Sequence, residues 1–208
     1  MYPVCLDLSR RLSVVVGGGA VAERKVQGLL AAGGQVRVVS PAMTSGLLAL
    51  AESHTVEWRQ KEYSAADLAG AFLVFAATNR PAVQRAVCRD ARAAGLLINV
   101  ADSPEVCDFQ VPATIRRGDL SLSVATNGKS PAVAAMVRKR LEREFGAEYA
   151  LLTRLASTLR EQLLADEEHC TDIKTLFQKI LHDDMVDWLR EQRWDRVQQH
   201  LESVLGQP

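Results

Sequence analysis

Residues 12–30 read LSVVVGGGAVAERKVQGLL, which places a β-branched run, three glycines and a helical pattern in succession. The run at 12–16 is short and apolar, as in buried strands. Beyond the glycines, apolar residues recur at helical spacing as far as Leu30. A second β-branched run at 36–39 completes a strand–helix–strand unit, and this order predicts two neighbouring parallel strands.

The same rhythm continues along the first half of the chain. Ser64 and Asp67 have the spacing of a capping box and predict a short helix. An apolar run at 72–77 predicts a buried strand, a helix is expected at 80–94, and a further strand at 97–100. Strands that alternate with helices in this way predict an α/β fold with a doubly wound parallel sheet covered on both faces.

After residue 109 the pattern changes. Apolar-rich runs at 109–116 and 120–126 are joined by Arg117-Gly-Asp119, which predicts a hairpin with a glycine turn. Ser130-Pro131 supplies an N-cap and a first-turn proline for a helix that we expect to end near Phe145. Beyond this point apolar residues recur at helical spacing, so a helical C-terminal segment is predicted.

Charge is balanced over the whole chain but not within it. The 25 Lys and Arg residues equal the 25 Asp and Glu residues, which argues against nucleic acid or an anionic membrane as a partner. Residues 114–145 carry seven basic and three acidic side chains, whereas residues 146–208 carry seven and twelve. The basic segment suggests contact with an anionic ligand, and a solvated helix face is the alternative.

The cysteines and the N-terminus point to a cytoplasmic protein. No CxxC or Cys/His cluster has the spacing of metal ligands, so no zinc site is expected. No stretch approaches 18 uninterrupted apolar residues, and charges interrupt the first eleven residues. We therefore expect reduced thiols at the four cysteines, which are Cys5, Cys88, Cys107 and Cys170.

Gly17-x-Gly19-x-x-Ala22 follows a predicted strand and opens a predicted helix, as a Rossmann dinucleotide fingerprint requires. The first glycine makes the tight turn, the second lets backbone approach a pyrophosphate, and Ala22 allows close helix–strand packing. A glycine turn without a ligand is the alternative. The second strand ends at Ser40 without Asp or Glu, and no arginine follows at once, which favours NAD over NADP. The Ser40 hydroxyl could bond a ribose.

Asp102 comes just after the predicted strand at 97–100, at the carboxyl edge where α/β sheets bind ligands. A carboxylate there can accept a proton, although an aspartate after a strand is, judged alone, more often a turn residue or a helix cap. Asn99, Glu105 and Asp108 share that ambiguity. No Ser/His/Asp or Cys/His set is visible, which disfavours hydrolysis.

Several spaced motifs closely resemble the precorrin-2 dehydrogenase family, whose members convert precorrin-2 to sirohydrochlorin on the way to siroheme. The resemblance spans residues 2–145. Thr126-Asn-Gly-Lys129 departs from the Ser-containing and Gly-Gly-Thr versions of its loop but keeps the hydroxyl. The motifs that carry it are Tyr2-Pro-Val, Val14-Val-Val-Gly-Gly-Gly-Ala-Val-Ala-Glu-Arg-Lys25, Asn99-Val-Ala-Asp102, Cys107-Asp-Phe109 with Pro112, Arg117-Gly-Asp-Leu120 and Thr126-Asn-Gly-Lys-Ser-Pro131.

The resemblance implies a homodimer and three parts: an NAD-binding Rossmann domain at 1–113, a dimerisation segment at 114–145 and a helical domain at 146–208. It also implies that Asp102 transfers the proton. The expected cofactor contacts are Gly17, Gly18, Gly19, Ala20, Val21, Ser40, Pro41, Ala42 and Thr78. Precorrin-2 carries eight carboxylates, which suits the basic segment, and the expected substrate contacts are Asn99, Arg116, Arg117, Thr126, Lys129 and Ser130, with Arg138 and Lys139 as further cations.

The leading hypothesis is an NAD-dependent dehydrogenase of precorrin-2 without a resident metal. Ferrous-iron insertion into sirohydrochlorin by the same cleft is an open second activity. The alternative from another class is a non-enzymatic Rossmann module that senses a nucleotide. Such a module would use the glycine turn but would have no need of Asp102.

Overall fold

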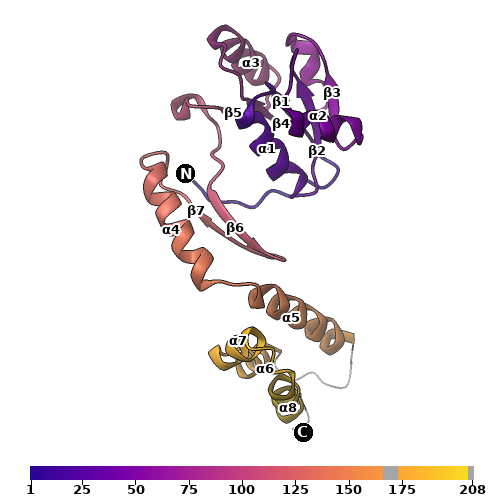
Figure 1. The fold of residues 1–208 in the computed structure, drawn as a ribbon, viewed down its shortest axis with the longest axis vertical. Coiled ribbons are helices and arrows are strands. Elements are labelled where there is room, and N and C mark those ends of the chain that lie inside the picture. The colour runs from indigo at the N-terminus through magenta and orange to yellow at the C-terminus, as the bar shows by residue number, and fades with distance from the viewer. Residues whose placement is uncertain (166–172, 206–208) are drawn as a thin grey trace. The chain divides into compact units, whose positions relative to one another are not determined.

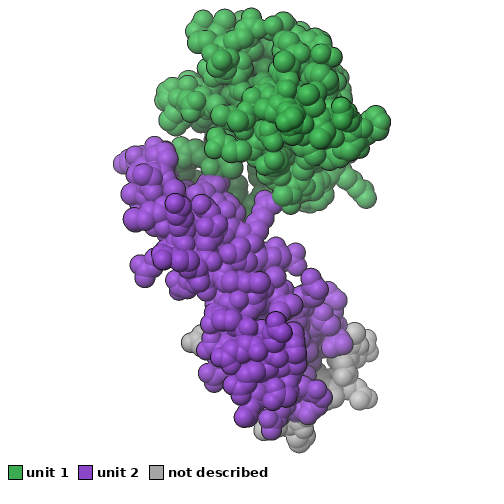
Figure 2. Space-filling model, viewed as in Figure 1, with its two compact units in different colours: residues 1–111 green, residues 112–208 purple. Residues whose placement is uncertain are grey.

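The computed structural model describes residues 1–165 and 173–205, and its ribbon is shown in Figure 1. Predicted helical positions at 166–172 and 206–208, with Cys170 among them, lie outside the described residues. The chain forms two compact units, residues 1–111 and residues 112–208 (Figure 2). The predicted division of the second unit into a dimerisation segment and a helical domain stays a prediction.

The first unit is built on one parallel five-stranded sheet, which confirms the predicted α/β class. Its strand order is β3-β2-β1-β4-β5, so the chain winds outward from β1 in both directions. Every neighbouring pair in the sheet is parallel. The strands are β1 (Leu12–Val16), β2 (Gln35–Val39), β3 (Glu57–Arg59), β4 (Ala71–Ala76) and β5 (Leu97–Val100).

Side chains of the central strand serve two cores because successive residues face opposite sides of a sheet. Val15 packs in the core that contains residues of helices α1 (Ala20–Leu30) and α2 (Ser45–Glu52). Val14 and Val16 pack in the core that contains residues of α3 (Pro81–Ala93). With both faces covered, the sheet exposes ligand-binding positions only at its ends.

Three elements of this unit are absent from the sequence prediction: α2, β3 and a 3₁₀ helix at Pro104–Val106. Strand β3 has only three residues, Glu57, Trp58 and Arg59, and its charged ends hide the strand pattern. Ion pairs hold this edge strand, with Arg37 Nε 2.8 Å and Arg59 Nε 2.9 Å from the Glu57 carboxylate. The predicted capping box at Ser64 is confirmed, although the helix that it caps is a 3₁₀ helix, Ala65–Leu68.

The second unit begins with the predicted hairpin, formed by antiparallel β6 (Ala113–Arg117) and β7 (Leu120–Val124). Gly118 has φ +57° and supplies the left-handed turn conformation. The expected start of the first strand at residue 109 is wrong. Phe109 instead packs edge-on against Phe75, with ring centroids 5.3 Å apart, and Pro112 cannot donate to a ladder.

Five helices follow the hairpin, as the sequence predicts for the described residues. The N-cap is confirmed, since Ser130 Oγ accepts from Val133 N at 3.3 Å. The last four helices enclose a small core of Leu159, Ile180, Met185, Leu189 and Val197. The helices are α4 (Pro131–Glu144), α5 (Glu148–Ala165), α6 (Ile173–Ile180), α7 (Asp183–Arg190) and α8 (Trp194–Leu205).

Two further observations concern membrane-spanning helices and cysteines. Among the described residues, no helix has the length and apolar character needed to cross a membrane. Cys5, Cys88 and Cys107 are free thiols.

Candidate functional site

The glycine turn between β1 and α1 is shaped by its neighbours. Gly17 has φ +128°, and a Cβ there would lie 2.2 Å from Ala77 O. A Cβ on Gly18 would lie 2.0 Å from Ala42 O. Both glycines therefore let the turn lie against the loops that follow β4 and β2.

Gly19 differs from the two glycines before it, because an added Cβ would meet no atom within 4 Å. It is also the N-cap of α1, and no side chain caps that helix end. The first backbone N–H groups of α1 therefore have no side-chain acceptor at this cap, and the helix dipole favours an anion there. The open space at Gly19 is where the fingerprint expects backbone to approach a pyrophosphate.

The glycine turn borders a cavity of about 720 Å³ at the carboxyl ends of the strands. All nine predicted cofactor residues line it, and so does Asp102. Five segments far apart in the sequence supply this lining: the β1–α1 turn, the β2–α2 loop, the segment after β3, the β4–α3 loop and the start of the loop after β5. The structure thus brings together residues that the sequence placed at separate strand ends.

Ser40, the predicted ribose contact, is almost buried and its hydroxyl donates to Ala42 O at 2.7 Å. This bond orders the loop after β2 and leaves the oxygen free to accept. Gln84 Nε2 donates to Thr78 O at 2.7 Å and orders the loop after β4 in the same way. Both predicted contacts therefore lie on loops held by the protein itself.

Sequence reasoning missed several lining residues, among them Glu62, Tyr63 and Arg80. Glu62 and Arg80 form an exposed ion pair, with Arg80 Nη1 2.5 Å from the carboxylate. Burial raises the pKa of Tyr63, with Asp90 adding to the effect, and its hydroxyl donates to Asp90 at 3.2 Å. Glu62 and Tyr63 follow β3, so recognition of that short strand was the signal that would have placed them at the sheet edge, whereas Arg80 follows the predicted strand β4.

Asp102 lies at the cavity in a left-handed backbone conformation, with φ +61°. Aspartate and asparagine tolerate this conformation better than most residues. The side chain is exposed, and within residues 1–165 and 173–205 it has no hydrogen bond or ion pair. It does not cap the following 3₁₀ helix, Pro104–Val106, whose N-cap is Ser103. Its carboxylate is therefore open toward the cavity and able to accept a proton.

The loop that carries Asp102 is bound to the edge strand β5 by side chains. Ile98 N donates to the Asp108 carboxylate at 3.0 Å, and Val100 N donates to Cys107 Sγ at 3.1 Å. Asn99 Nδ2 donates to Phe109 O at 3.0 Å. Asn99 is buried and does not line the cavity, so its predicted substrate contact stays a prediction while its observed role is to hold this loop.

The other predicted substrate residues lie in the second unit, where several serve its own structure. Thr126 Oγ1 accepts from Ser130 N at 3.1 Å and so closes the loop before α4. The Arg117 guanidinium donates to Phe145 O at 2.8 Å and to Glu142 O at 3.2 Å, at the end of α4. Arg116 and Lys129 are exposed, and the structure assigns their charged groups no partner among the described residues.

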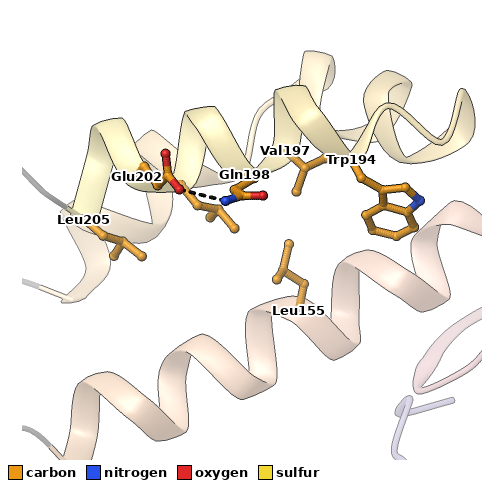
Figure 3. A pocket seen from close by; sticks show the side chains of 7 residues that line it. Leu155, Trp194, Val197, Gln198, Glu202 and Leu205 are labelled. Carbon is orange, nitrogen blue, oxygen red and sulfur yellow. Dashed lines mark hydrogen bonds between the residues drawn. The ribbon is translucent and has the colours of Figure 1, made fainter.

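A second cavity, of about 690 Å³, lies in the second unit between α5 and α8 (Figure 3). Leu155 faces Trp194 and Val197 across it, and Gln198 Nε2 donates to Glu202 Oε1 at 2.9 Å. Glu202 is the ionisable group of its lining. The first cavity, by contrast, is bordered by the glycine turn and by the Asp102 carboxylate, which makes it the candidate site.

A doubly wound parallel sheet with a glycine turn at its carboxyl edge defines a Rossmann-type dinucleotide-binding protein. Comparison with known proteins gives the particular family. The family described as "Putative NAD(P)-binding" matches residues 4–113, and the one described as "Sirohaem biosynthesis protein central" matches residues 117–144. The chain belongs to the family of siroheme synthase N-terminal modules and SirC-type precorrin-2 dehydrogenases.

Relatives and solved structures agree with this placement. Siroheme synthase 1 of Aeromonas salmonicida is 35% identical over 88% of this chain and 39% of its own length. Siroheme synthase of Xylella fastidiosa is 33% identical over 100% of the chain and 44% of its own length. The chain thus spans well under half of these relatives. The solved structure of SirC, a precorrin-2 dehydrogenase, matches with a TM-score of 0.78 and 26% identity, over 100% of both chains.

Proposed function

We propose that the protein oxidises precorrin-2 to sirohydrochlorin with NAD, and that Asp102 accepts the proton. The observation that carries the proposal is the open Asp102 carboxylate in the cavity lined by the glycine turn. The likeness to SirC over the full chain supports it. Oxidation of this substrate transfers a hydride to the nicotinamide, which is the electron sink, and releases a proton to a base. The chain's own contribution is to position the two molecules and to take the proton.

NAD is proposed over NADP because of the charges at the cavity. A 2′-phosphate needs a free cation near the end of β2, and Ser40, Pro41 and Ala42 stand there. The arginine that lines the cavity, Arg80, is already paired with Glu62. The Glu62 carboxylate at the cavity favours a ribose hydroxyl and disfavours the 2′-phosphate of NADP.

The substrate is a polyanion, and exposed cations of the second unit suit it. Arg116, Lys129 and Lys139 are exposed, whereas Arg117 is bound to the end of α4 and Arg138 is paired with Glu142. A cation without a protein partner gains most from a carboxylate ligand. Arg116, Lys129 and Lys139 are therefore the better candidates for electrostatic contact.

A homodimer through the segment that contains α4 is part of the proposal. On this helix Val133 is 45% and Met136 64% exposed, while Ala134 is its one buried residue among those described. An amphipathic helix whose apolar side chains face water is stabilised when a second copy covers them. This exposure supports a partner surface on α4.

Substitution of Asp102 tests the proposed function and separates it from the nucleotide-sensing alternative. Asp102→Asn preserves the shape and the tolerance for the left-handed backbone but removes the proton acceptor. General-base assistance is typically worth about 10²- to 10⁴-fold in rate, so kcat is expected to fall by that range. NAD affinity is expected to stay unchanged because the glycine turn and helix end hold the pyrophosphate.

The measurement is anaerobic turnover of precorrin-2 with NAD, followed by absorbance of the product, together with calorimetric titration of NAD. Ferrous ions added afterwards test the chelatase activity. Turnover of Asp102→Asn within about threefold of the parent would mean that the proton leaves to water. A parent protein that binds NAD without turnover would instead favour the sensing module.

A further inference from the structure

Lys25 is a half-buried cation close to the candidate site that the proposed reaction does not yet use. It lies on α1 one turn after Val21, and Val21 lines the cavity. Residues four apart share a helix face, and helical side chains lean toward the helix N-terminus. The cavity lies at the N-terminal end of α1, so Lys25, which does not itself line the cavity, lies one turn from it with its side chain directed toward that end of the helix.

The surroundings of the Lys25 ammonium are mostly apolar. Its Nζ atom lies 5.3 Å from the centroid of the Phe75 ring, over the aromatic face. Phe75 is only 2% exposed and packs edge-on against Phe109. Burial lowers the pKa of Lys25 and the charge of Arg24 adds to this effect, while Cys107 and Asp102 act in the opposite direction. Val21, one turn before Lys25 on α1, and Asp102 line the same cavity.

The Lys25 ammonium lacks a polar partner in the part of the chain that the structure describes. Apart from the Phe75 ring, it has no hydrogen bond or ion pair within residues 1–165 and 173–205. Other part-buried cations of the chain are bound: Arg37 donates to Glu57 and to Asp67 O, and Arg117 donates to carbonyl groups. A cation removed from water without a partner is unfavourable and gains strongly when an anion arrives.

We propose that Lys25 binds a carboxylate group of the tetrapyrrole and so fixes the substrate beside Asp102. This inference rests on the proposed function, which supplies an anionic substrate at this end of the sheet. A carboxylate would give the ammonium the charge-assisted hydrogen bonds that the protein does not provide. Lys25 is then a substrate-binding residue, and Asp102 keeps the role of proton acceptor.

Three variants test this role. Lys25→Met keeps the length of the side chain and removes the charge, and Lys25→Arg keeps a charge that does not titrate. Arg24→Met is the matched control, since it removes one charge from the exposed neighbouring position on the same helix. Each is assayed anaerobically with saturating NAD and varied precorrin-2, and its folding is checked by thermal unfolding.

Hydrogen bonds to charged groups are worth about 1.5–3 kcal/mol, so Lys25→Met is expected to raise KM for precorrin-2 about 10- to 100-fold. NAD affinity should stay unchanged, Lys25→Arg should recover KM to within about fivefold, and Arg24→Met should lie within about twofold of the parent. A folded Lys25→Met protein with unchanged KM would overturn the inference. So would a Lys25→Arg protein with normal KM but kcat lost, because Lys25 would then be the proton acceptor.

Failure of the proposed function gives a different result from failure of this inference. A parent protein that does not turn over precorrin-2 contradicts the function and, with it, the role of Lys25. Parent turnover with no effect of Lys25→Met contradicts the role of Lys25 alone. If Lys25→Met does not fold, Lys25→Gln replaces it, and an unchanged KM in that folded variant overturns the inference equally.

Discussion

The two units of the chain differ in where their apolar side chains lie. In the first unit Val14, Val15 and Val16 on the central strand are all at most 2% exposed, because helices cover both faces of the sheet. In the second unit Met136 on α4 is 64% exposed and Trp194 on α8 is 53% exposed. The central strand of the first unit is thus enclosed, whereas α4 and α8 of the second unit each carry a large apolar side chain that is mostly exposed in the single chain.

This difference suggests that substitutions in the two units will have different effects. A sheet buried on both faces is a rigid frame, and its open end carries a cavity lined largely by backbone turns. Helices with exposed apolar residues are expected to gain further stability when a partner covers those residues. Substitutions in the first unit should therefore alter folding and cofactor binding, and those on α4 should alter assembly.

The largest effect is expected from Gly17→Ala, which tests how rigid the frame is. The residue has φ +128°, and an added Cβ would lie 2.2 Å from the backbone oxygen of Ala77. The side chain would therefore force the backbone at Gly17 or at Ala77 to move. The free energy of unfolding of the first unit should fall by more than about 4 kcal/mol. Urea unfolding measures this, and a loss below about 1 kcal/mol would mean that the turn adapts.

Gly19→Asp is the counterpart at the open position of the same turn. No atom lies within 4 Å of its added Cβ, so the protein should fold. The carboxylate would occupy the space and repel the charge of the pyrophosphate, so NAD binding should be lost. Calorimetric titration with NAD shows this directly, and unchanged affinity would make the turn purely structural.

The next largest effect concerns the small core of the second unit. Leu189 is 3% exposed, and truncation of a buried leucine to alanine costs about 2–5 kcal/mol. Leu189→Ala should destabilise the second unit by this amount and leave NAD affinity unchanged. Leu164→Ala, at a position that is 62% exposed, is the matched control and should cost less than about 0.5 kcal/mol. Equal costs would contradict a separate helical core.

A smaller effect is expected at Asp67, a buried carboxylate of the first unit. Burial alone would raise its pKa, but hydrogen bonds from Lys61, Arg59 and Ser64 outweigh burial and lower the pKa from 3.8 to about 2. A lowered folded-state pKa gives stability that is present above pH 4 and lost as the pH falls through about 2. The ionised Asp67 carboxylate thus contributes about 2 kcal/mol to the free energy of unfolding at neutral pH.

Asp67→Asn should therefore lower the free energy of unfolding by about 2 kcal/mol at pH 7. At pH 3 the difference in unfolding free energy between variant and parent should be roughly half as large. Denaturant unfolding at both pH values measures it. Asp119→Asn, at an exposed position without an ion pair among the described residues, serves as the control and should be nearly neutral at either pH. A difference that grows toward low pH would contradict the sign argued here.

The smallest effect on folding but a clear one on assembly is expected from Met136→Lys. The position is exposed in the single chain, so unfolding of the monomer should change by less than about 0.5 kcal/mol. A charge placed in a dimer interface opposes association. In size-exclusion chromatography with light scattering, the parent should have a mass of about twice 22.8 kDa and the variant a mass of about 22.8 kDa. A monomeric parent at micromolar concentration would contradict the dimer.

Much of the fold was predictable because its signals are local. The glycine turn after a β-branched run, the proline at 81 and the Ser130 N-cap each act within a few residues of themselves. These signals marked β1 and the helices α1, α3 and α4, and the short apolar runs at 36–39, 72–77 and 97–100 marked β2, β4 and β5. Strand β3 was not predicted because three residues with charged ends are too short to show an alternating pattern. Only pairing with β2 makes them a strand.

The site was predictable where its residues come directly after recognisable strands, and not elsewhere. By itself the sequence determined the glycine turn and the position of Asp102 at a strand end. Only the tertiary structure decided that Asn99 holds a loop, that Glu62 meets Arg80 at the cavity, and that the Lys25 ammonium lies over the Phe75 ring. These roles depend on contacts between segments distant along the chain, and the direction and burial of a side chain there are set by packing rather than by its neighbours in sequence.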